Sequence, residues 1–153
     1  MPVTHFATFD EIEHRVGDEL AVSDWMEITQ ERVDLFAEAT GDHQWIHTDP
    51  ERAARESPYG GPIAHGYLTL SLLARMAGDS MVFASTRMGV NYGVNRVRFT
   101  GPVPVGSRIR AHFVLAGFER IPGGVQLVFA VTMEREGVDK PVMVAETVSR
   151  RYA

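Results

Sequence analysis

The segment from Gly66 to Gly78 is apolar on almost every side if it is helical. Its sequence is GYLTLSLLARMAG. The apolar residues that spread around such a helix are Tyr67, Leu68, Leu70, Leu72, Leu73, Met76 and Ala77. A helix with so little polar face is unstable on a surface, and we expect the rest of the chain to enclose it.

Four later stretches have the composition of strands that could provide this enclosure. They are rich in β-branched and aromatic residues, are separated by Pro/Gly turns, and lie near residues 87–100, 107–119, 124–136 and 141–152. In the second stretch every other residue is apolar, which is typical of a sheet with one buried face. The alternating residues are Ile109, Ala111, Phe113 and Leu115. The sequence therefore predicts an α+β fold in which a curved antiparallel sheet wraps around one helix.

Two further helices are predicted upstream of this segment. Between Thr29 and Gly41 the apolar residues fall at helical spacing, with Thr29 placed to cap the start and Gly41 to end the helix. Asp49 and Pro50 then offer a cap followed by proline at the first helical position, so the run ERAARES is expected to form a short helix.

Length and composition favour one compact domain over residues 1–153. A chain of 153 residues with 44% hydrophobic residues is long enough for one sizeable core and too short for two ordinary domains. The absence of cysteine excludes a disulfide framework, a zinc-thiolate site and a cysteine nucleophile. The formal net charge of −5 argues against nucleic-acid binding. The first twenty residues lack an apolar run, so we expect no signal peptide, no membrane anchor and, by default, a cytoplasmic protein.

Two short motifs carry groups suited to chemistry. The run GDHQWIH, residues 41 to 47, places Asp42 and His47 five positions apart just after a helix end, where an irregular loop could turn both inward. Eighteen residues later, Ala64-His65-Gly66 leads into the apolar helix. The first N–H groups of a helix are unpaired and lie at the positive end of its dipole, so this terminus could stabilise a developing oxyanion.

These motifs together resemble the MaoC-like hydratases, the (R)-specific enoyl-CoA hydratase group with the hot dog fold. The resemblance spans nearly the whole chain and includes the later run NYGVNRVRFTGPVPVGSRIR. Asp42 and His47 match the family signature in identity and spacing. Gln44 stands where asparagine is usual in the family, and Trp45 where proline is usual.

The resemblance implies a hydro-lyase that adds water to a trans-2-enoyl thioester or removes it from a 3-hydroxyacyl thioester. Asp42 and His47 are then expected to share one water molecule, with Asp42 the stronger candidate for proton transfer and His47 for positioning. The backbone N–H of Gly66 is the expected oxyanion donor. No metal or other cofactor is expected, because no third ligand stands at a sensible spacing; coenzyme A or acyl carrier protein would carry the substrate.

Several other residues are candidates for weaker roles. The substrate-binding candidates are Gln44, Tyr67, Tyr92 and Arg98. For Gln44 the alternative is a role in shaping the loop, for the two tyrosines core packing, and for Arg98 a solvated sheet face instead of contact with coenzyme A phosphates.

For a further set of polar residues we expect structural roles and no part in the chemistry. We expect His65 to pack under the helix start and His43 to face solvent. Asn91 and Asn95 are unusual in a strand and indicate a bulge or a turn at a dimer interface.

Two rival functions remain at this stage. A hot dog thioesterase would direct water at the thioester carbonyl, and a nodulation-type accessory protein would bind acyl thioesters without turnover. The resemblance further implies a homodimer, because a second subunit would cover the surface that a single sheet leaves open.

Overall fold

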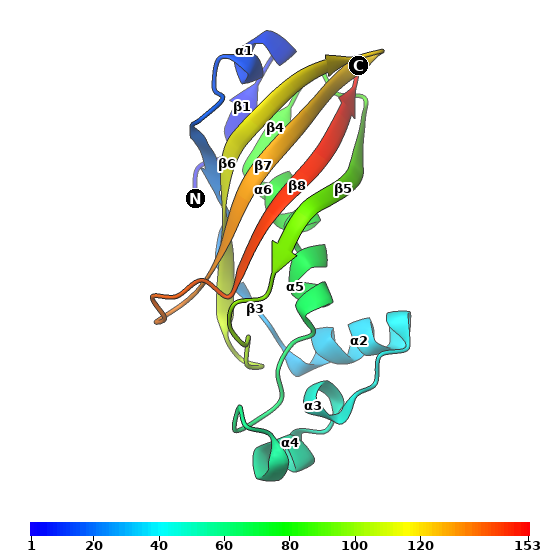
Figure 1. Cartoon of the computed structure of the whole chain (residues 1–153), viewed down its shortest axis with the longest axis vertical. Coiled ribbons are helices and arrows are strands. Elements are labelled where there is room, and N and C mark those ends of the chain that lie inside the picture. Colours follow the sequence, from blue (N-terminus) through cyan, green and yellow to red (C-terminus); the bar gives the residue numbers. More distant parts are fainter.

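A curved antiparallel sheet forms the main layer of the computed structural model, which describes all residues from 1 to 153 (Figure 1). Its strands are β2 (Glu19–Val22), β3 (Met26–Glu27), β5 (Met88–Arg98), β6 (Arg108–Ile121), β7 (Gly124–Arg135) and β8 (Met143–Tyr152). Their order is β2-β6-β7-β8-β5, and β3 also pairs with β6. The four predicted strands are confirmed as β5 to β8, which form the long part of this sheet.

A second, parallel pair of strands lies beside one end of the sheet. It consists of β1 (Thr4–Phe6) and β4 (Met81–Phe83). These short strands, and β2 and β3, were not predicted from the sequence.

The helices lie on the concave side of the sheet and at both of its ends. They are α1 (Phe9–Glu13), α2 (Gln30–Thr40), α3 (Trp45–Thr48), α4 (Pro50–Glu56), α5 (Gly66–Ser71) and α6 (Leu73–Ser80). Figure 1 shows α5 and α6 following the concave face, while α2, α3 and α4 gather past the start of α5.

Local capping explains why the two upstream helices begin where they were predicted. The Thr29 hydroxyl accepts a hydrogen bond from the Arg32 N–H at the start of α2, and Gly41 ends that helix with φ +79°. The Asp49 carboxylate caps α4 in the same way, with Pro50 in the first turn. Both predictions are confirmed.

The predicted apolar helix differs from its prediction in two respects. It is broken at Leu72, whose N–H is shared between the carbonyls of Leu68 and Leu70, so it forms two helices. It is also not enclosed on every side: Tyr67 is 70% exposed, and Arg75 faces solvent as well. The exposed side chains lie on one face, which the concave sheet does not reach within a single chain.

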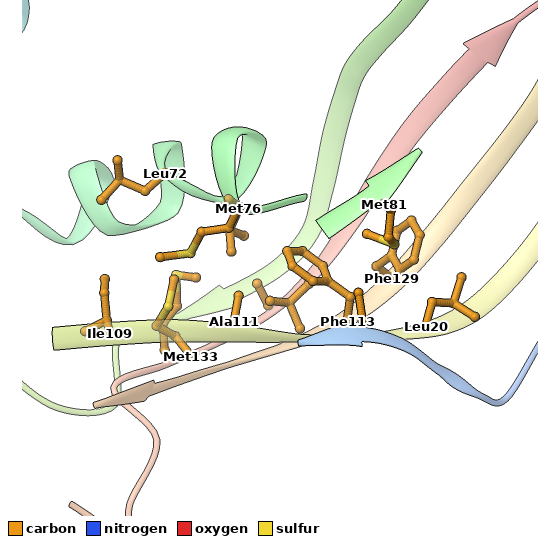
Figure 2. Packing of buried hydrophobic residues seen from close by; sticks show 14 of the residues in the cluster. Leu20, Leu72, Met76, Met81, Ile109, Ala111, Phe113, Phe129 and Met133 are labelled. Carbon is orange, nitrogen blue, oxygen red and sulfur yellow. The ribbon is translucent and has the colours of Figure 1, made fainter. Parts of the chain in front are cut away.

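One apolar core joins this helix pair to the sheet. It contains 26 buried residues, and the inward residues of β6 belong to it as predicted. Figure 2 shows Met76 of α6 directed toward Ala111 and Met133 on the sheet, with Phe113 and Phe129 further along. The buried face of the sheet thus anchors the helix that presents Gly66 at its start.

Strand β5 forms an exposed edge of the sheet. It pairs only with β8, and its register shifts between Asn91 and Gly93 and again between Val94 and Arg96. These shifts confirm the predicted bulge. The alternative of core packing for Tyr92 is wrong, because its side chain is 57% exposed at this edge.

Candidate active site

The loop after α2 brings Asp42 to the mouth of the site. The left-handed Gly41 turns the chain, and its N–H bonds to the Ala37 carbonyl. The Asp42 side chain is exposed, and its Oδ1 lies 3.4 Å from the Gln44 nitrogen in an Asx-type turn. This weak contact leaves carboxylate lone pairs free for another donor.

His47 lies in a short helix and not, as predicted, in an irregular loop. The run from Trp45 to Thr48 forms α3, in which His47 is buried. Its Nδ1 lies 2.7 Å from the Ile63 carbonyl oxygen. Since a carbonyl can only accept, Nδ1 carries the proton and Nε2 presents a lone pair. The Gln30 side chain further anchors this turn by donating to the His47 carbonyl at 2.8 Å.

His65, in the Ala64-His65-Gly66 motif, contacts both Asp42 and His47 of the other motif. This role was not predicted from the sequence. Its Nε2 lies 3.0 Å from the Asp42 carbonyl oxygen, and its ring stacks on His47 with 3.9 Å between centroids. Phe36 packs against its other side, with 4.9 Å between ring centroids. The prediction that His65 packs under the helix start is confirmed, and the packing partners are those of the site itself.

The three polar side chains converge on one small volume. One ligand-type atom from each of Asp42, His47 and His65 lies within 4.8 Å of the others. No direct hydrogen bond joins Asp42 to His47, but a single water with hydrogen bonds of about 2.8 Å to each could span such a gap.

The same trio supplies three groups of metal-ligand type, so the expected lack of a third ligand is not found. The two imidazole rings are stacked, however, with an angle of 25° between their planes. Their in-plane lone pairs therefore run side by side and do not converge on one metal position.

Gly66 begins α5 beside a cavity of about 400 Å³. Its N–H belongs to the first helical turn, which offers it no intrahelical acceptor. A Cβ at this position would lie 2.9 Å from the Phe99 ring, so only glycine fits here without movement. Phe99 and Tyr59 line the same cavity, and nothing in their sequence context pointed to the site.

The four substrate-binding candidates lie at different distances from this centre. Gln44 precedes α3, and its carbonyl accepts from the N–H groups of His47 and Thr48. Tyr67 is exposed and packs edge-on against Phe99, next to Gly66. Arg98 is exposed and bonds only to the Val97 carbonyl, and Tyr92 lies under the Arg150 guanidinium.

The residues on either side of Gln44 contact neighbouring helices. His43 faces solvent, 3.5 Å from Glu38, which confirms its prediction. Trp45 packs against Arg52, whose guanidinium lies 4.3 Å from the ring centroid. No helix of the chain is both long and apolar enough to cross a bilayer.

Comparison with known proteins identifies the family. The family model for the MaoC like domain matches residues 11–137. The chain belongs to the MaoC-like dehydratases. It is therefore an enzyme of the hydro-lyase class, and its sheet and helix form a hot dog fold.

Relatives of this MaoC-like dehydratase span nearly its whole length. It is 48% identical to 3-hydroxyacyl-thioester dehydratase Z of Mycobacterium tuberculosis over 97% of its own chain and 98% of that protein. It is 46% identical to Nodulation protein N of Rhizobium leguminosarum over 95% of its own chain and 91% of that protein. The solved (R)-hydratase from A. caviae, involved in PHA biosynthesis, shares the fold with a TM-score of 0.70, 22% identity, and 89% and 96% coverage.

The environment of His47 predicts how this MaoC-like dehydratase responds to pH. Burial lowers the pKa of His47 below its ordinary value of 6.5; the Ile63 carbonyl raises it, His65 lowers it and Asp42 raises it. If neutral His47 is needed, kcat/KM should stay level from pH 8 to 6.5 and fall only below 6.5. The free energy of unfolding should change in the same direction. The stability that comes from burying neutral His47 is fully present above the pKa of the unfolded state and is lost as pH falls below it, because the unfolded state binds the proton more readily.

Initial rates between pH 4.5 and 8.5 test this expectation, together with urea unfolding at the same pH values. The exposed His43→Gln variant is the matched control and should keep the wild-type profile. An acid limb centred above pH 6.5 would contradict a role for neutral His47.

Proposed function

We propose that this MaoC-like dehydratase catalyses the reversible hydration of trans-2-enoyl thioesters to (R)-3-hydroxyacyl thioesters. The observation that carries the proposal is the convergence of Asp42 and His47 on one volume beside the start of α5. The likeness to a 48% identical 3-hydroxyacyl-thioester dehydratase and to a solved (R)-hydratase supports the same chemistry.

In the hydration direction, one water molecule is held between Asp42 and His47. His47 presents its Nε2 lone pair because Nδ1–H is committed to the Ile63 carbonyl. As the water oxygen attacks the β-carbon, its proton passes to this pair, with Asp42 as the principal base and His47 positioning the water. The same groups then deliver a proton to the α-carbon, so no net charge remains on the protein.

The thioester carbonyl gains enolate character as the β-carbon is attacked. The Gly66 N–H donates to this oxygen at the positive end of α5, where charge stabilisation is needed only in the transition state. The reaction needs no metal, redox group or other cofactor. Coenzyme A or acyl carrier protein carries the acyl group, and Arg98, Gln44, Tyr67 and Tyr92 stay candidates for contacting it.

The exposed edge strand β5 supports a homodimer. Val90, Tyr92 and Val94 are exposed there, and β5 has no partner on its outer side. A second copy would cover these side chains and the exposed face of α5. Light scattering at micromolar concentration should give a mass of two chains; a stable monomer would contradict this proposal.

One assay separates this function from its rivals. Loss of enoyl absorbance, thiol release and chirality of the product are followed for short, medium and long trans-2-enoyl-CoAs. Hydration to the (R)-alcohol is the expected result. Thiol release without hydration would indicate a thioesterase. Tight acyl-CoA binding with no turnover would indicate an accessory protein, as the name of the relative from Rhizobium, Nodulation protein N, suggests.

A further inference from the structure

A second cavity, of about 460 Å³, lies between the helix pair α5–α6 and the strands β5 and β8. Its volume falls in the range of small-molecule sites, about 300–1,000 Å³. Most of its wall is apolar. The larger apolar residues of this wall are Leu70, Leu73, Met81, Val94, Phe113 and Phe129.

One strip of this cavity is polar. Ser149 and Arg151 alternate on β8 and therefore face the same side, and Asn91 of β5 pairs directly with Ser149. The Oγ of Ser149 is buried and has no hydrogen-bond partner. Asn91, Ser149 and Arg151 together form this polar strip.

Arg151 is held in the strip without a counterion. Its Nε is buried with no hydrogen-bond partner, and no carboxylate forms a salt bridge with it. Its guanidinium stacks on Phe83 at 4.4 Å from the ring centroid, an arrangement that leaves the in-plane N–H donors free. Burial lowers the pKa of Arg151, as expected for a cation removed from water.

Gly89 makes room for this guanidinium. It pairs with Arg151 across the β5–β8 ladder, and a Cβ on Gly89 would lie 3.1 Å from an Arg151 terminal nitrogen. The guanidinium can therefore lie flat across β5 and reach the cavity. No aspartate, glutamate or lysine lines the cavity, so its only charge is positive.

We propose that this cavity binds an apolar chain that ends in a carboxylate. The apolar walls enclose the chain, and the carboxylate pairs with Arg151 and accepts hydrogen bonds from Ser149 and Asn91. A partly buried cation without a partner is unfavourable, and a bidentate carboxylate both neutralises it and satisfies its donors. A neutral alkyl end would leave the same donors unsatisfied.

Such a ligand has two sources, a free fatty carboxylate or the far end of an acyl-thioester substrate. The cavity begins at Leu70, which lies about 6 Å beyond Gly66 at 1.5 Å per helical residue. An acyl group held at Gly66 could therefore extend toward the polar strip. This second source rests on the proposed function, whereas binding of a free carboxylate does not.

Calorimetric titration with monomeric dodecanoate tests the site directly and requires no enzymatic activity. Arg151→Met should weaken binding roughly tenfold or more. Arg150→Met is the matched control, because Arg150 is the adjacent residue of β8 but bonds to Gln126 and stacks on Tyr92. It should bind dodecanoate like the wild type, and dodecanol should bind the wild type no better than it binds Arg151→Met.

The melting temperatures of the same variants exclude a purely structural role. Removing an unpaired buried charge should leave the melting temperature of Arg151→Met unchanged or raise it. Ala77→Phe fills the cavity from α6, leaves Arg151 itself unchanged, and should also abolish dodecanoate binding. A large fall in the melting temperature of Arg151→Met, with intact dodecanoate binding in Ala77→Phe, would overturn the proposal.

Kinetics then distinguish the two sources. The KM values of two trans-2-enoyl-CoAs of equal length, one ending in a methyl group and one in a carboxylate, are compared between the wild type and Arg151→Met. If the substrate supplies the carboxylate, Arg151→Met raises KM roughly tenfold for the carboxylate-ended substrate alone, and dodecanoate competes with it. If a free fatty carboxylate is the ligand, both substrates behave alike and dodecanoate still binds. Equal dodecanoate affinity in Arg151→Met and Arg150→Met would refute the site in either case.

Discussion

Asp42→Asn is expected to lower kcat/KM for crotonyl-CoA hydration by roughly a thousandfold, within the 10²–10⁴ range typical of a positioned general base. The amide is nearly the same size, so the Asx-type contact with the Gln44 N–H and the His65 bond to the backbone carbonyl at residue 42 are preserved. The ability to accept the proton of water is lost. Loss of enoyl absorbance measures the rate.

Two comparisons make this result specific. His43→Asn, in the same loop but facing solvent, should keep wild-type activity. His47→Ala should lose most activity too, and the double variant of Asp42 and His47 should be little worse than either single change, because both act on one water. Circular dichroism checks that each variant folds. Substantial activity in the double variant would refute the assignment.

Gly66→Pro should remove the oxyanion donor and lower kcat by a factor of 10²–10³, about 3 kcal/mol of barrier. Proline suits this position, because the first helical turn tolerates it and His65 already has ψ 137°, the backbone conformation that precedes proline. The obstacle is the Phe99 ring, 2.9 Å from where the new Cβ would lie. The change is therefore made together with Phe99→Ala.

The matched control is Gly66→Ala with Phe99→Ala. It has the same Cβ and the same vacated ring but keeps the N–H, so the ratio of the two double variants isolates the donor. Single-turnover rates with crotonyl-CoA give this ratio. Equal rates for the two variants would remove Gly66 from the mechanism.

The sequence predicted the parts of the fold that depend on local pattern. Alternation in β6, the threonine cap at Thr29 and the Asp49-Pro50 pair are short-range signals, and each element lies where it was expected. Strands β1 and β4 were missed because three-residue strands carry no periodicity and exist only through pairing with each other. The helix break at Leu72 was missed because no glycine or proline marks it.

The sequence predicted which residues form the site, but not the contacts that orient them. Asp42 and His47 carried a recognisable five-residue spacing, and the structure brings them together. The contacts that orient them come from residues distant in sequence, such as the Ile63 carbonyl, which fixes the His47 tautomer, and Gln30, which anchors its turn. Contacts of this kind depend on how α2 and α3 lie relative to α5, which single-sequence patterns do not specify.

The two register shifts in β5 bear on how this chain avoids polymerising. A long, exposed edge with apolar side chains is ordinarily a template for open-ended stacking of strands, as in amyloid. In β5 the shifts at Asn91–Gly93 and Val94–Arg96 twist the strand and interrupt the even spacing of its free N–H and C=O groups. A flat strand from an unrelated chain cannot form a continuous ladder with it, so the edge of a single chain is protected from indiscriminate pairing before a second copy covers it.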